Sequence, residues 1–241
     1  MRKSLLVAGA TGVLGNEVMR RMVGMQSHTA VKVLAREPMT PALRSVSVMV
    51  VPQSPIADWP ATPADTGIIM FDPPRLYYDR ERALWTPQPA DLLSLAQWMR
   101  LCGVRTLAVV LPHAQGRLPD ALKRGLASLD EHAVVALGFE RILIVRSARK
   151  ADAIKSDASF LQKTAAWMLS IASFMVPTSE QPVRASKLAE LVQKALAVLP
   201  PGTHIAAPEL VWQAAQGSVD AVVHAWLHPA NKDSTAKSTH A

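Results

Sequence analysis

One short stretch near the start of the chain limits what the rest of it can fold into. Residues 4–8 are mostly apolar, residues 9–15 read Gly-Ala-Thr-Gly-Val-Leu-Gly, and a helix-like pattern follows. This order predicts a strand, a tight glycine-rich turn and the first turn of a helix. Such a turn points backbone N–H groups and the positive end of a helix dipole at one place, which suits the pyrophosphate of a dinucleotide. The stretch therefore indicates a dinucleotide site in an α/β protein.

Each of the three glycines has its own role in this interpretation. Gly9 permits the tight turn, Gly12 leaves room for the phosphates, and Gly15 lets the new helix pack closely on the strand. Their spacing is G-x-x-G-x-x-G, whereas the commoner dinucleotide pattern is G-x-G-x-x-G. The position of the glycines between a strand and a helix, more than their number, favours a nucleotide site over a structural loop.

The remaining chain alternates between apolar runs of strand length and amphipathic runs of helix length. Further strands are predicted at residues 30–35, 45–51, 67–71, 106–111, 141–145 and 204–207. Helices are predicted at residues 16–23, 89–101, 119–137, 162–176, 185–199 and 208–227, the last with an optional break at Gly217. Strands and helices that alternate at this spacing predict an α/β fold with a Rossmann-like, doubly wound, mostly parallel sheet and a small C-terminal helical addition.

The same pattern divides the chain into three parts. We expect residues 1–150 to form an NAD(P)-binding Rossmann core, and residues 151–230 to complete the same domain as a substrate-binding or interface segment. The polar residues 231–241 predict a disordered tail. In the second part, the helix that carries Trp167, Phe174 and Met175 is expected to be buried or to line the interface of a homodimer.

Composition and charge narrow the classes of protein to which the chain can belong. Of its 241 residues, 49% are hydrophobic and 19% are charged, which is typical of a packed globular domain. The single cysteine, Cys102, excludes an internal disulfide framework and a cysteine-rich metal site. The net charge of +7 comes from scattered basic residues without interleaved aromatic ones, so we expect no nucleic-acid partner.

The apolar stretches do not have the pattern of membrane or secreted proteins. The uncharged run at residues 164–179 is shorter than the roughly 20 residues that span a bilayer. The apolar run at the N-terminus is too short for a secretion signal and is needed as a strand. We therefore expect no membrane span and a cytoplasmic location.

Two stretches carry a resemblance to a known family. The first is residues 9–15, and the second is residues 131–146, where family members commonly read E-x-A-L-x-x-x-G-x-x-x-x-x-I-x-R-P. With these residues the chain resembles the atypical short-chain dehydrogenases/reductases, an NAD(P)H-binding group that includes NmrA-like and nucleoside-diphosphate-sugar-epimerase-like proteins. The resemblance extends from about residue 4 to about residue 215, and it implies a Rossmann-fold protein that binds NAD(P)H.

The end of the second predicted strand indicates which dinucleotide is bound. An acidic residue there holds the ribose 2′-OH of NAD, whereas a basic residue accommodates the 2′-phosphate of NADP. Arg36 stands at this position, and its guanidinium can make a bidentate, charge-assisted bond to phosphate. The alternative for Arg36 is a solvated loop position. NADP(H) is favoured over NAD(H), and the predicted cofactor-binding residues are Gly9, Thr11, Gly12, Val13, Leu14, Gly15 and Arg36.

The catalytic residues that the resemblance implies are absent from their expected positions. Enzymes of this superfamily use a Tyr-x-x-x-Lys pair to transfer a proton and hold the ribose, together with a Ser that positions the substrate. Counted back from Glu131, the Tyr and Lys positions hold Lys123 and Ala127. Pro112 and His113 follow the fifth predicted strand, where the Ser would stand. The usual mechanism of the family is therefore unsupported.

Three other residues are candidates for catalysis. Tyr78 follows the fourth predicted strand at the ligand-binding edge, but an ordinary tyrosine pKa near 10 needs a specific perturber before the group can act near pH 7. His113 lies just after the fifth strand, and histidine is the usual proton shuttle. Lys123 could donate a proton or bind a phosphate. For each residue the alternative is a solvated surface position.

Two classes of function stay open on the residues alone. The first is an NADPH-dependent oxidoreductase with a non-standard proton donor. The second is a non-catalytic NADP(H)-binding protein that acts as a redox sensor, regulator or assembly factor. The glycine turn fits both classes equally, so whether the chain is an enzyme is left open, and neither a small-molecule substrate nor a protein partner can be named.

Overall fold

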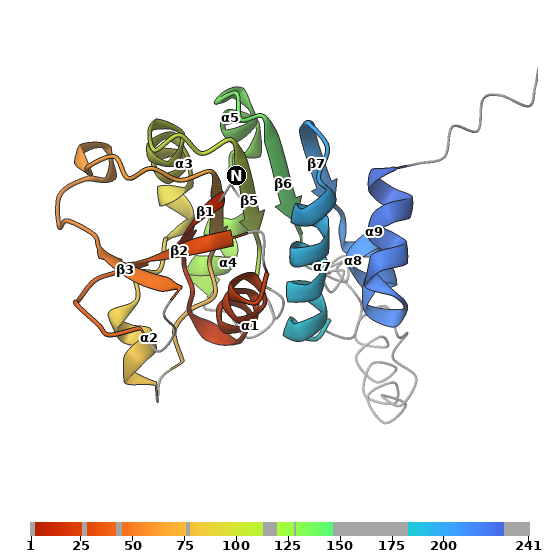
Figure 1. The fold of residues 1–241 in the computed structure, drawn as a ribbon, viewed down its shortest axis with the longest axis horizontal. Helices are drawn as coiled ribbons and strands as arrows, with labels where there is room; N and C mark the ends of the chain where they lie inside the picture. The colour runs from red at the N-terminus through yellow and green to blue at the C-terminus, as the bar shows by residue number, and fades with distance from the viewer. Residues whose placement is uncertain are drawn as a thin grey trace, which may run out of the picture.

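Seven parallel strands form one sheet in the computed structural model, in the order β3-β2-β1-β4-β5-β6-β7 (Figure 1). The structure describes residues 3–25, 28–41, 45–75, 78–112, 120–127, 129–146 and 183–228. The strands are β1 (Lys3–Ala8), β2 (His28–Ala35), β3 (Val46–Val50), β4 (Thr66–Met70), β5 (Thr106–Val110), β6 (Arg141–Val145) and β7 (Gly202–Ala206). All six pairings between neighbouring strands are parallel, so the predicted Rossmann-like, doubly wound sheet is confirmed.

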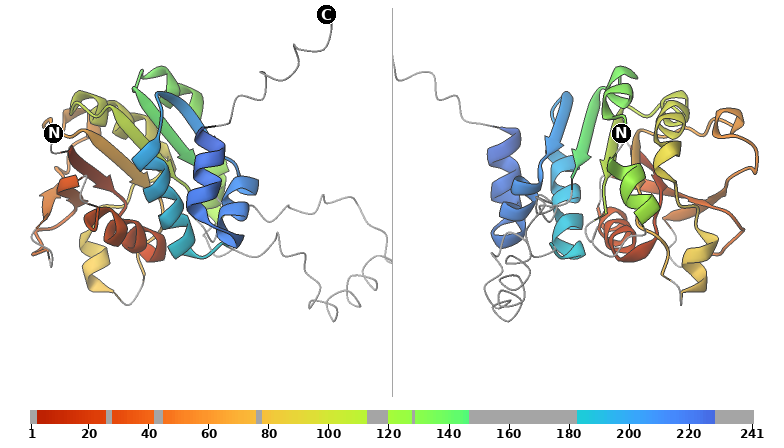
Figure 2. Two further views of the ribbon diagram at one scale, coloured as in Figure 1. Left: turned by 45° about the vertical axis from the view of Figure 1, so that its right-hand side comes forward. Right: turned by 180° about the vertical axis from the view of Figure 1, so that it is seen from behind.

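Helices cover both faces of this sheet, as the views from the front and from behind show (Figures 1 and 2). The face shared by the first and last parts of the chain carries α1 (Gly12–Val23), α7 (Ala185–Val198), α8 (Pro208–Gln216) and α9 (Val219–Leu227). The opposite face carries α3 (Leu92–Leu101), α4 (Asp120–Ala127) and α5 (Glu131–Ala136). Three short elements lie between strands and helices, namely η1 (Ile56–Asp58), α2 (Asp79–Ala83) and η2 (Pro89–Asp91).

The strands read as nearly continuous apolar runs because each face of the sheet is buried under helices. Successive side chains of a strand point to opposite faces. In β1, Leu5 and Val7 belong to the core beneath α1 and α7, whereas Leu6 and Ala8 belong to the core beneath α3 and α5. All four side chains are fully buried. The sheet therefore separates two hydrophobic cores, and its apolar pattern could be read from the sequence.

The strand order reverses beside β1, which pairs with β2 on one side and with β4 on the other. Chain segments that leave the carboxyl ends of β1 and β4 diverge at such a point, and ligands of doubly wound proteins bind there. The connection from β1 to α1 and the connection from β4 to α3 both start at this edge. We call residues 9–12 the glycine loop, and the described residues 71–75 and 78–88 the β4–α3 segment.

Two long predicted helices are each divided in the structure. The single helix predicted at residues 119–137 is wrong, because α4 ends at Ala127 and α5 starts at Glu131. Asp130 is the reason, since its carboxylate accepts a hydrogen bond of 2.9 Å from the Ala133 N–H and begins a new helix. Residues 208–227 are likewise divided at the optional break, between α8 and α9.

Other boundaries differ more modestly from the predictions. Helix α1 begins at Gly12, four residues before the predicted start, and α2 was not predicted at all. The predicted helix at residues 162–176 and the predicted tail at 231–241 lie outside the described residues. Among the described residues, no helix has the length and apolar character needed to cross a lipid bilayer.

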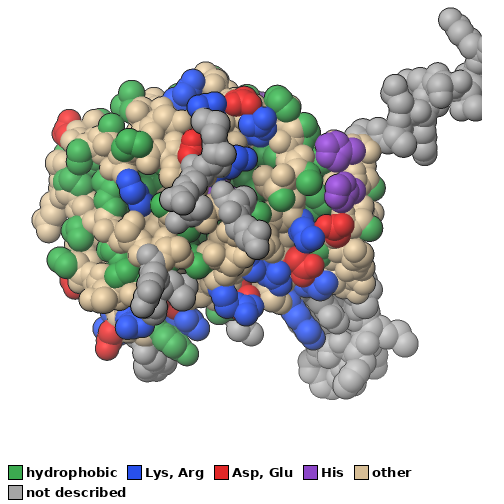
Figure 3. All heavy atoms as spheres, viewed as in Figure 1, with side chains coloured by type: hydrophobic (Ala, Val, Ile, Leu, Met, Phe, Trp, Pro, Cys, Tyr) green, Lys and Arg blue, Asp and Glu red, His purple; other side chains and the backbone are tan. Residues whose placement is uncertain are grey.

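The charged side chains on the face shown in Figure 3 form several small, separate groups, in which basic residues lie beside acidic ones. Several of the described basic residues are in surface ion pairs, such as Arg20 with Glu17 and Lys194 with Asp220. Exposed pairs of this kind contribute little to stability. The expectation that the protein has no nucleic-acid partner stays a prediction.

Candidate functional site at the glycine loop

The backbone of the glycine loop requires glycine for reasons of packing. Gly9 and Gly12 have positive φ angles of 76° and 68°, which side chains disfavour. A Cβ atom at Gly9 would lie 1.9 Å from the carbonyl oxygen of Met70 in the neighbouring strand β4. A Cβ atom at Gly15, one turn into α1, would lie 2.8 Å from the Gly9 carbonyl oxygen. Gly15 thus allows the close packing of α1 that was predicted for it, whereas the close approach of Gly9 to β4 was not predicted.

The space beside Gly12 is filled by the chain itself. A Cβ atom at Gly12 would lie 2.8 Å from Cβ of Asp72 and 3.0 Å from the carbonyl oxygen of Pro73. Both residues lie within three residues of the end of β4. Gly12 was predicted to leave room for phosphates, but in this conformation the start of the β4–α3 segment takes that room.

Two carboxylates bind the first N–H groups of α1. The Gly12 N–H donates to Oε2 of Glu81 at 2.9 Å, and the Leu14 N–H donates to Oδ2 of Asp72 at 3.2 Å. These backbone groups lack partners within the helix, and together with the helix dipole they favour a negative charge. In a dinucleotide-binding protein a phosphate would accept such bonds. Here side chains from residues far along the chain accept them.

Glu81 is held in this place by several donors. Its carboxylate accepts hydrogen bonds from the Arg75 backbone N–H at 2.9 Å, from Arg75 Nε at 2.7 Å and from Asn16 Nδ2 at 2.7 Å, and it pairs with Arg75 Nη2. The Arg75 guanidinium also lies 3.8 Å from the centre of the Tyr78 ring. Burial alone would raise the pKa of Glu81, but the hydrogen bonds from Arg75 and Gly12 together lower it. Glu81, which is 4% exposed, is therefore a buried carboxylate ion.

The pKa of Asp72 is shifted in the opposite direction from that of Glu81. Burial raises the pKa of its carboxyl group to about 6, the hydrogen bond from the Leu14 N–H opposes this rise, and the nearby charge of Glu81 adds to it. Its backbone carbonyl accepts a hydrogen bond from the hydroxyl of Thr11, whose Oγ1 also lies 3.1 Å from Oγ1 of Thr86. Asp72 thus titrates near neutral pH within the cluster that closes the glycine loop.

Backbone hydrogen bonds fix the second half of the β4–α3 segment across the same edge. The Gly9 N–H donates to the Trp85 carbonyl at 3.1 Å, and the Trp85 N–H donates to the Leu34 carbonyl at 3.0 Å. The Arg36 N–H donates to the Ala83 carbonyl at 2.7 Å. Residues 83–85 therefore lie along the ends of β1 and β2.

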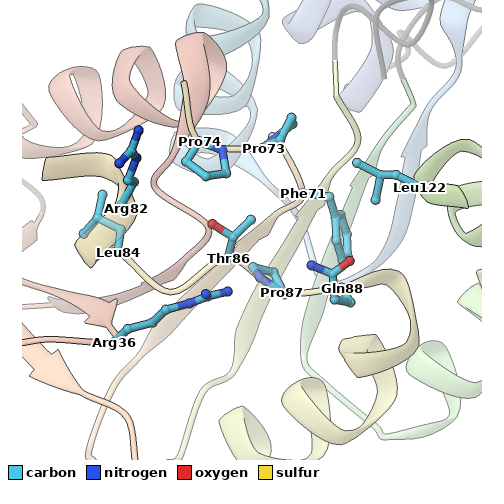
Figure 4. Close-up of a pocket in the computed structure, with 10 residues that line it drawn as sticks. All are labelled: Arg36, Phe71, Pro73, Pro74, Arg82, Leu84, Thr86, Pro87, Gln88 and Leu122. Atoms are coloured by element: carbon cyan, nitrogen blue, oxygen red, sulfur yellow. The ribbon is translucent and has the colours of Figure 1, made fainter. Parts of the chain in front are cut away.

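Two hollows adjoin residues 83–85, and Arg36 lines both of them. The larger has a volume of about 690 Å³ and lies beside the ends of β2 and β3, with Pro52, Ile56 and Trp85 among its lining residues. The smaller, of about 170 Å³, lies between Arg82, Phe71 and residues 84–88. Figure 4 shows Arg36 extending from the end of β2 toward Thr86 and Pro87.

The predicted cofactor residues are brought together at one edge, but they differ in accessibility. Thr11, Leu14 and Gly15 are buried, whereas Val13 is 47% exposed and Arg36 is exposed. Asp72 and Glu81 were missed by the sequence analysis. Asp72 carried a usable signal, since it directly follows a strand at the ligand-binding edge. Glu81 carried none, because its contact depends on the path of the whole segment.

The two candidate catalytic residues that the structure describes lie on separate elements, Tyr78 at the start of α2 and Lys123 on α4. Tyr78 is 52% exposed, and its ring lies against Arg75. Lys123 forms an ion pair of 3.2 Å with Asp120, one turn earlier on α4. His113 lies outside the described residues. Arg146, directly after β6, pairs with Glu131 at the start of α5.

A dinucleotide fits one part of this edge and not another. The larger hollow beside Arg36, of about 690 Å³, has a volume within the usual range of roughly 300–1,000 Å³ for ligand sites. The pyrophosphate position does not fit in this conformation, because Asp72, Pro73 and Glu81 occupy the space and the donors. A second negative group at this place would also be repelled by the Glu81 carboxylate.

No family model matches the chain, and no curated protein matches it in sequence. Solved structures do resemble it. One is the triphenylmethane reductase of Citrobacter sp. complexed with NADP(H), at 15% identity and a TM-score of 0.48 over 83% of this chain and 68% of that one. Another is a nucleoside-diphosphate-sugar epimerase from Staphylococcus aureus, at 14% identity and a TM-score of 0.48 over 85% and 70%. A third is a short-chain dehydrogenase/reductase from Veillonella parvula in complex with NADP, at 14% identity and a TM-score of 0.41 over 60% and 70%. Similarities of this degree carry no conclusion about this chain.

Proposed function

We propose that this protein binds NADP(H) at the carboxyl edge of its sheet and acts through binding, as a redox sensor, regulator or assembly factor. The observation that carries the proposal is the position of Arg36. It stands at the end of β2 beside the glycine loop and lines a hollow of about 690 Å³. A guanidinium in this place suits a 2′-phosphate, and a hollow of this size can receive the attached adenosine.

The lining of the hollow supports an adenine-type ligand. Trp85, Pro52 and Ile56 are among its lining residues. Apolar and aromatic surfaces with a few placed polar groups are typical of small-molecule sites. Asp91 and Ser94 supply such polar groups in the lining. Whether a small-molecule substrate or a protein partner completes the function stays a prediction, as does a homodimeric state.

A binding role is favoured over catalysis by where the candidate proton donors lie. A proton donor must come within hydrogen-bond distance of the reacting group. The ring of Tyr78 packs on Arg75 at the protein surface, and the ammonium group of Lys123 pairs with Asp120. Neither side chain lines either of the two hollows beside Arg36. An oxidoreductase would therefore need a donor other than these two.

Titration calorimetry with NADPH and NADH tests the proposal. We expect the wild-type protein to bind NADPH more tightly than NADH. Arg36→Glu should remove this preference by lowering NADPH affinity about 10- to 100-fold, which corresponds to the loss of a hydrogen-bonded charge pair. Arg20→Glu is the matched control, because it makes the same change of charge on the exposed part of α1.

Two results would contradict the proposal. The first is that neither NADPH nor its 2′-phosphoadenosine part binds to the wild-type protein or to any variant. The second is steady oxidation of NADPH in the presence of quinones, aldehydes or enones, which would make the protein an oxidoreductase. Equal affinities of wild type and Arg36→Glu would place the 2′-phosphate elsewhere.

A further inference from the structure

We propose that the β4–α3 segment is an internal competitor for the pyrophosphate position, so that Glu81 must leave the glycine loop before a dinucleotide can bind. This inference rests on the proposed function and adds a regulation of the same site. Its basis is that the segment contacts α1 twice. The Glu81 carboxylate accepts a hydrogen bond from the Gly12 N–H, and the Asp72 carboxylate accepts one from the Leu14 N–H.

The two carboxylates and a pyrophosphate require the same donors. An N–H group at a helix start can satisfy one strong acceptor at a time, and here two of the first three N–H groups of α1 already donate to carboxylates. The space is also shared, since Cβ of Asp72 lies only 2.8 Å from the place where a Cβ atom of Gly12 would be. Binding of one anion therefore excludes the other by both charge and volume.

The β4–α3 segment itself supplies the positive charge that pairs with Glu81, so the ion pair lies entirely within the segment. Arg75 binds the Glu81 carboxylate through its backbone and its guanidinium, and both residues belong to the segment. If Glu81 moves away, Arg75 can move with it, so no buried charge is left without a partner. Helix α2, which carries Glu81, is only five residues long and has few buried residues. Local opening of such an element is less costly than unfolding the sheet.

The two parts of the proposed site, one for the adenosine and one for the pyrophosphate, therefore differ in accessibility. The hollow beside Arg36 is open in this conformation, whereas the glycine loop is closed by Asp72 and Glu81. A ligand that needs only the hollow should bind without opening the segment. A ligand with a pyrophosphate should bind with an affinity reduced by the fraction of closed molecules.

Glu81→Gln provides the test, with adenosine 2′-monophosphate and NADPH as the two probes in calorimetry. The variant keeps the shape of the side chain and removes its charge. We expect its affinity for NADPH to be about tenfold higher than that of wild type, because the closed form is weakened. Its affinity for adenosine 2′-monophosphate should stay within about twofold. Asp79→Asn is the matched control, since it removes one negative charge from the exposed face of the same helix.

The outcomes separate the inference from the proposed function. If Glu81→Gln, Asp79→Asn and wild type bind NADPH equally, the segment does not compete and the inference is overturned while the proposed function stands. If adenosine 2′-monophosphate binds but NADPH binds neither to wild type nor to any variant, release of Glu81 does not admit a pyrophosphate, and both the inference and the proposed binding of NADP(H) are overturned. If neither probe binds to any variant, the proposed function fails.

A reversible crosslink tests the same point without removing Glu81. The hydroxyl oxygens of Thr11 and Thr86 lie 3.1 Å apart, one on the glycine loop and one on the segment. In the double variant Thr11→Cys/Thr86→Cys, oxidation should join the two and abolish NADPH binding, while adenosine 2′-monophosphate still binds. Reduction should raise the NADPH affinity above that of the oxidised form of the same variant, and mass spectrometry reports the state of the bond. Equal NADPH affinity of the oxidised and reduced forms would overturn the inference.

Discussion

Asp72 shows how the fold changes the chemistry of a single residue. In the unfolded chain its carboxyl group has an ordinary pKa of 3.8, and burial beside Glu81 raises that pKa to about 6 in the folded protein. The folded state therefore binds this proton more tightly than the unfolded state does. Stability that is present at low pH is lost as the pH rises through about 6.

Asp72→Asn should remove this loss of folding stability at higher pH. A shift of about two pH units corresponds to about 3 kcal/mol of destabilisation above pH 7. An amide oxygen in place of Oδ2 can still accept the hydrogen bond from the Leu14 N–H. We expect urea unfolding to show a fall in stability of about 1–1.5 kcal/mol for wild type between pH 5 and pH 8, beyond any fall in the variant. Parallel pH profiles would show that Asp72 is not buried as described.

Gly12→Ala is a second prediction at this scale. The positive φ of 68° and the 2.8 Å approach of Cβ of Asp72 oppose a methyl group, so we expect a loss of about 2–3 kcal/mol of unfolding free energy. Gly24→Ala is the control, because Gly24 has an ordinary φ of −72° and its nearest neighbours are 3.5 Å away. If both variants are equally stable in urea, the glycine loop has a different conformation.

At the scale of the element, the N-cap decides where a helix begins, even where the apolar pattern continues. Residues 119–137 carry one helical periodicity, but Asp130 accepts a hydrogen bond from the Ala133 N–H and starts α5 there. Glu131 then follows at the first position of α5, where it pairs with Arg146 at the end of β6. A fixed helix start thus orients the contact between α5 and the sheet.

Asp130→Ala tests this role of the cap. Loss of a side-chain cap costs about 1 kcal/mol, and we expect a decrease of this size in the free energy of unfolding. Asp120→Ala is the control, because the Asp120 side chain is 90% exposed and pairs with Lys123 on the helix surface, a contact of little energetic weight. Equal stabilities of the two variants in denaturant would mean that α4 and α5 do not depend on this cap.

At the scale of the whole molecule, the sheet brings residues of distant segments to one edge. β1 lies between β2 and β4, so Arg36, the glycine loop and the β4–α3 segment meet where the strand order reverses. The predicted strands lie within a few residues of the observed ones, since fully buried parallel strands have a strong apolar signal. The helix boundaries were less accurate, because caps such as Asp130 depend on single side chains.

The sequence by itself determined the parallel sheet, the need for glycine at Gly9 and Gly15, and the position of Arg36 at the end of β2. These features follow from local patterns of apolar residues, turns and strand ends. Only the tertiary structure decided which groups bind the start of α1. Asp72 and Glu81 come from 58 and 69 residues further along the chain than their partners. Contacts at that separation depend on how β4 and α2 are placed in space, which no local pattern records.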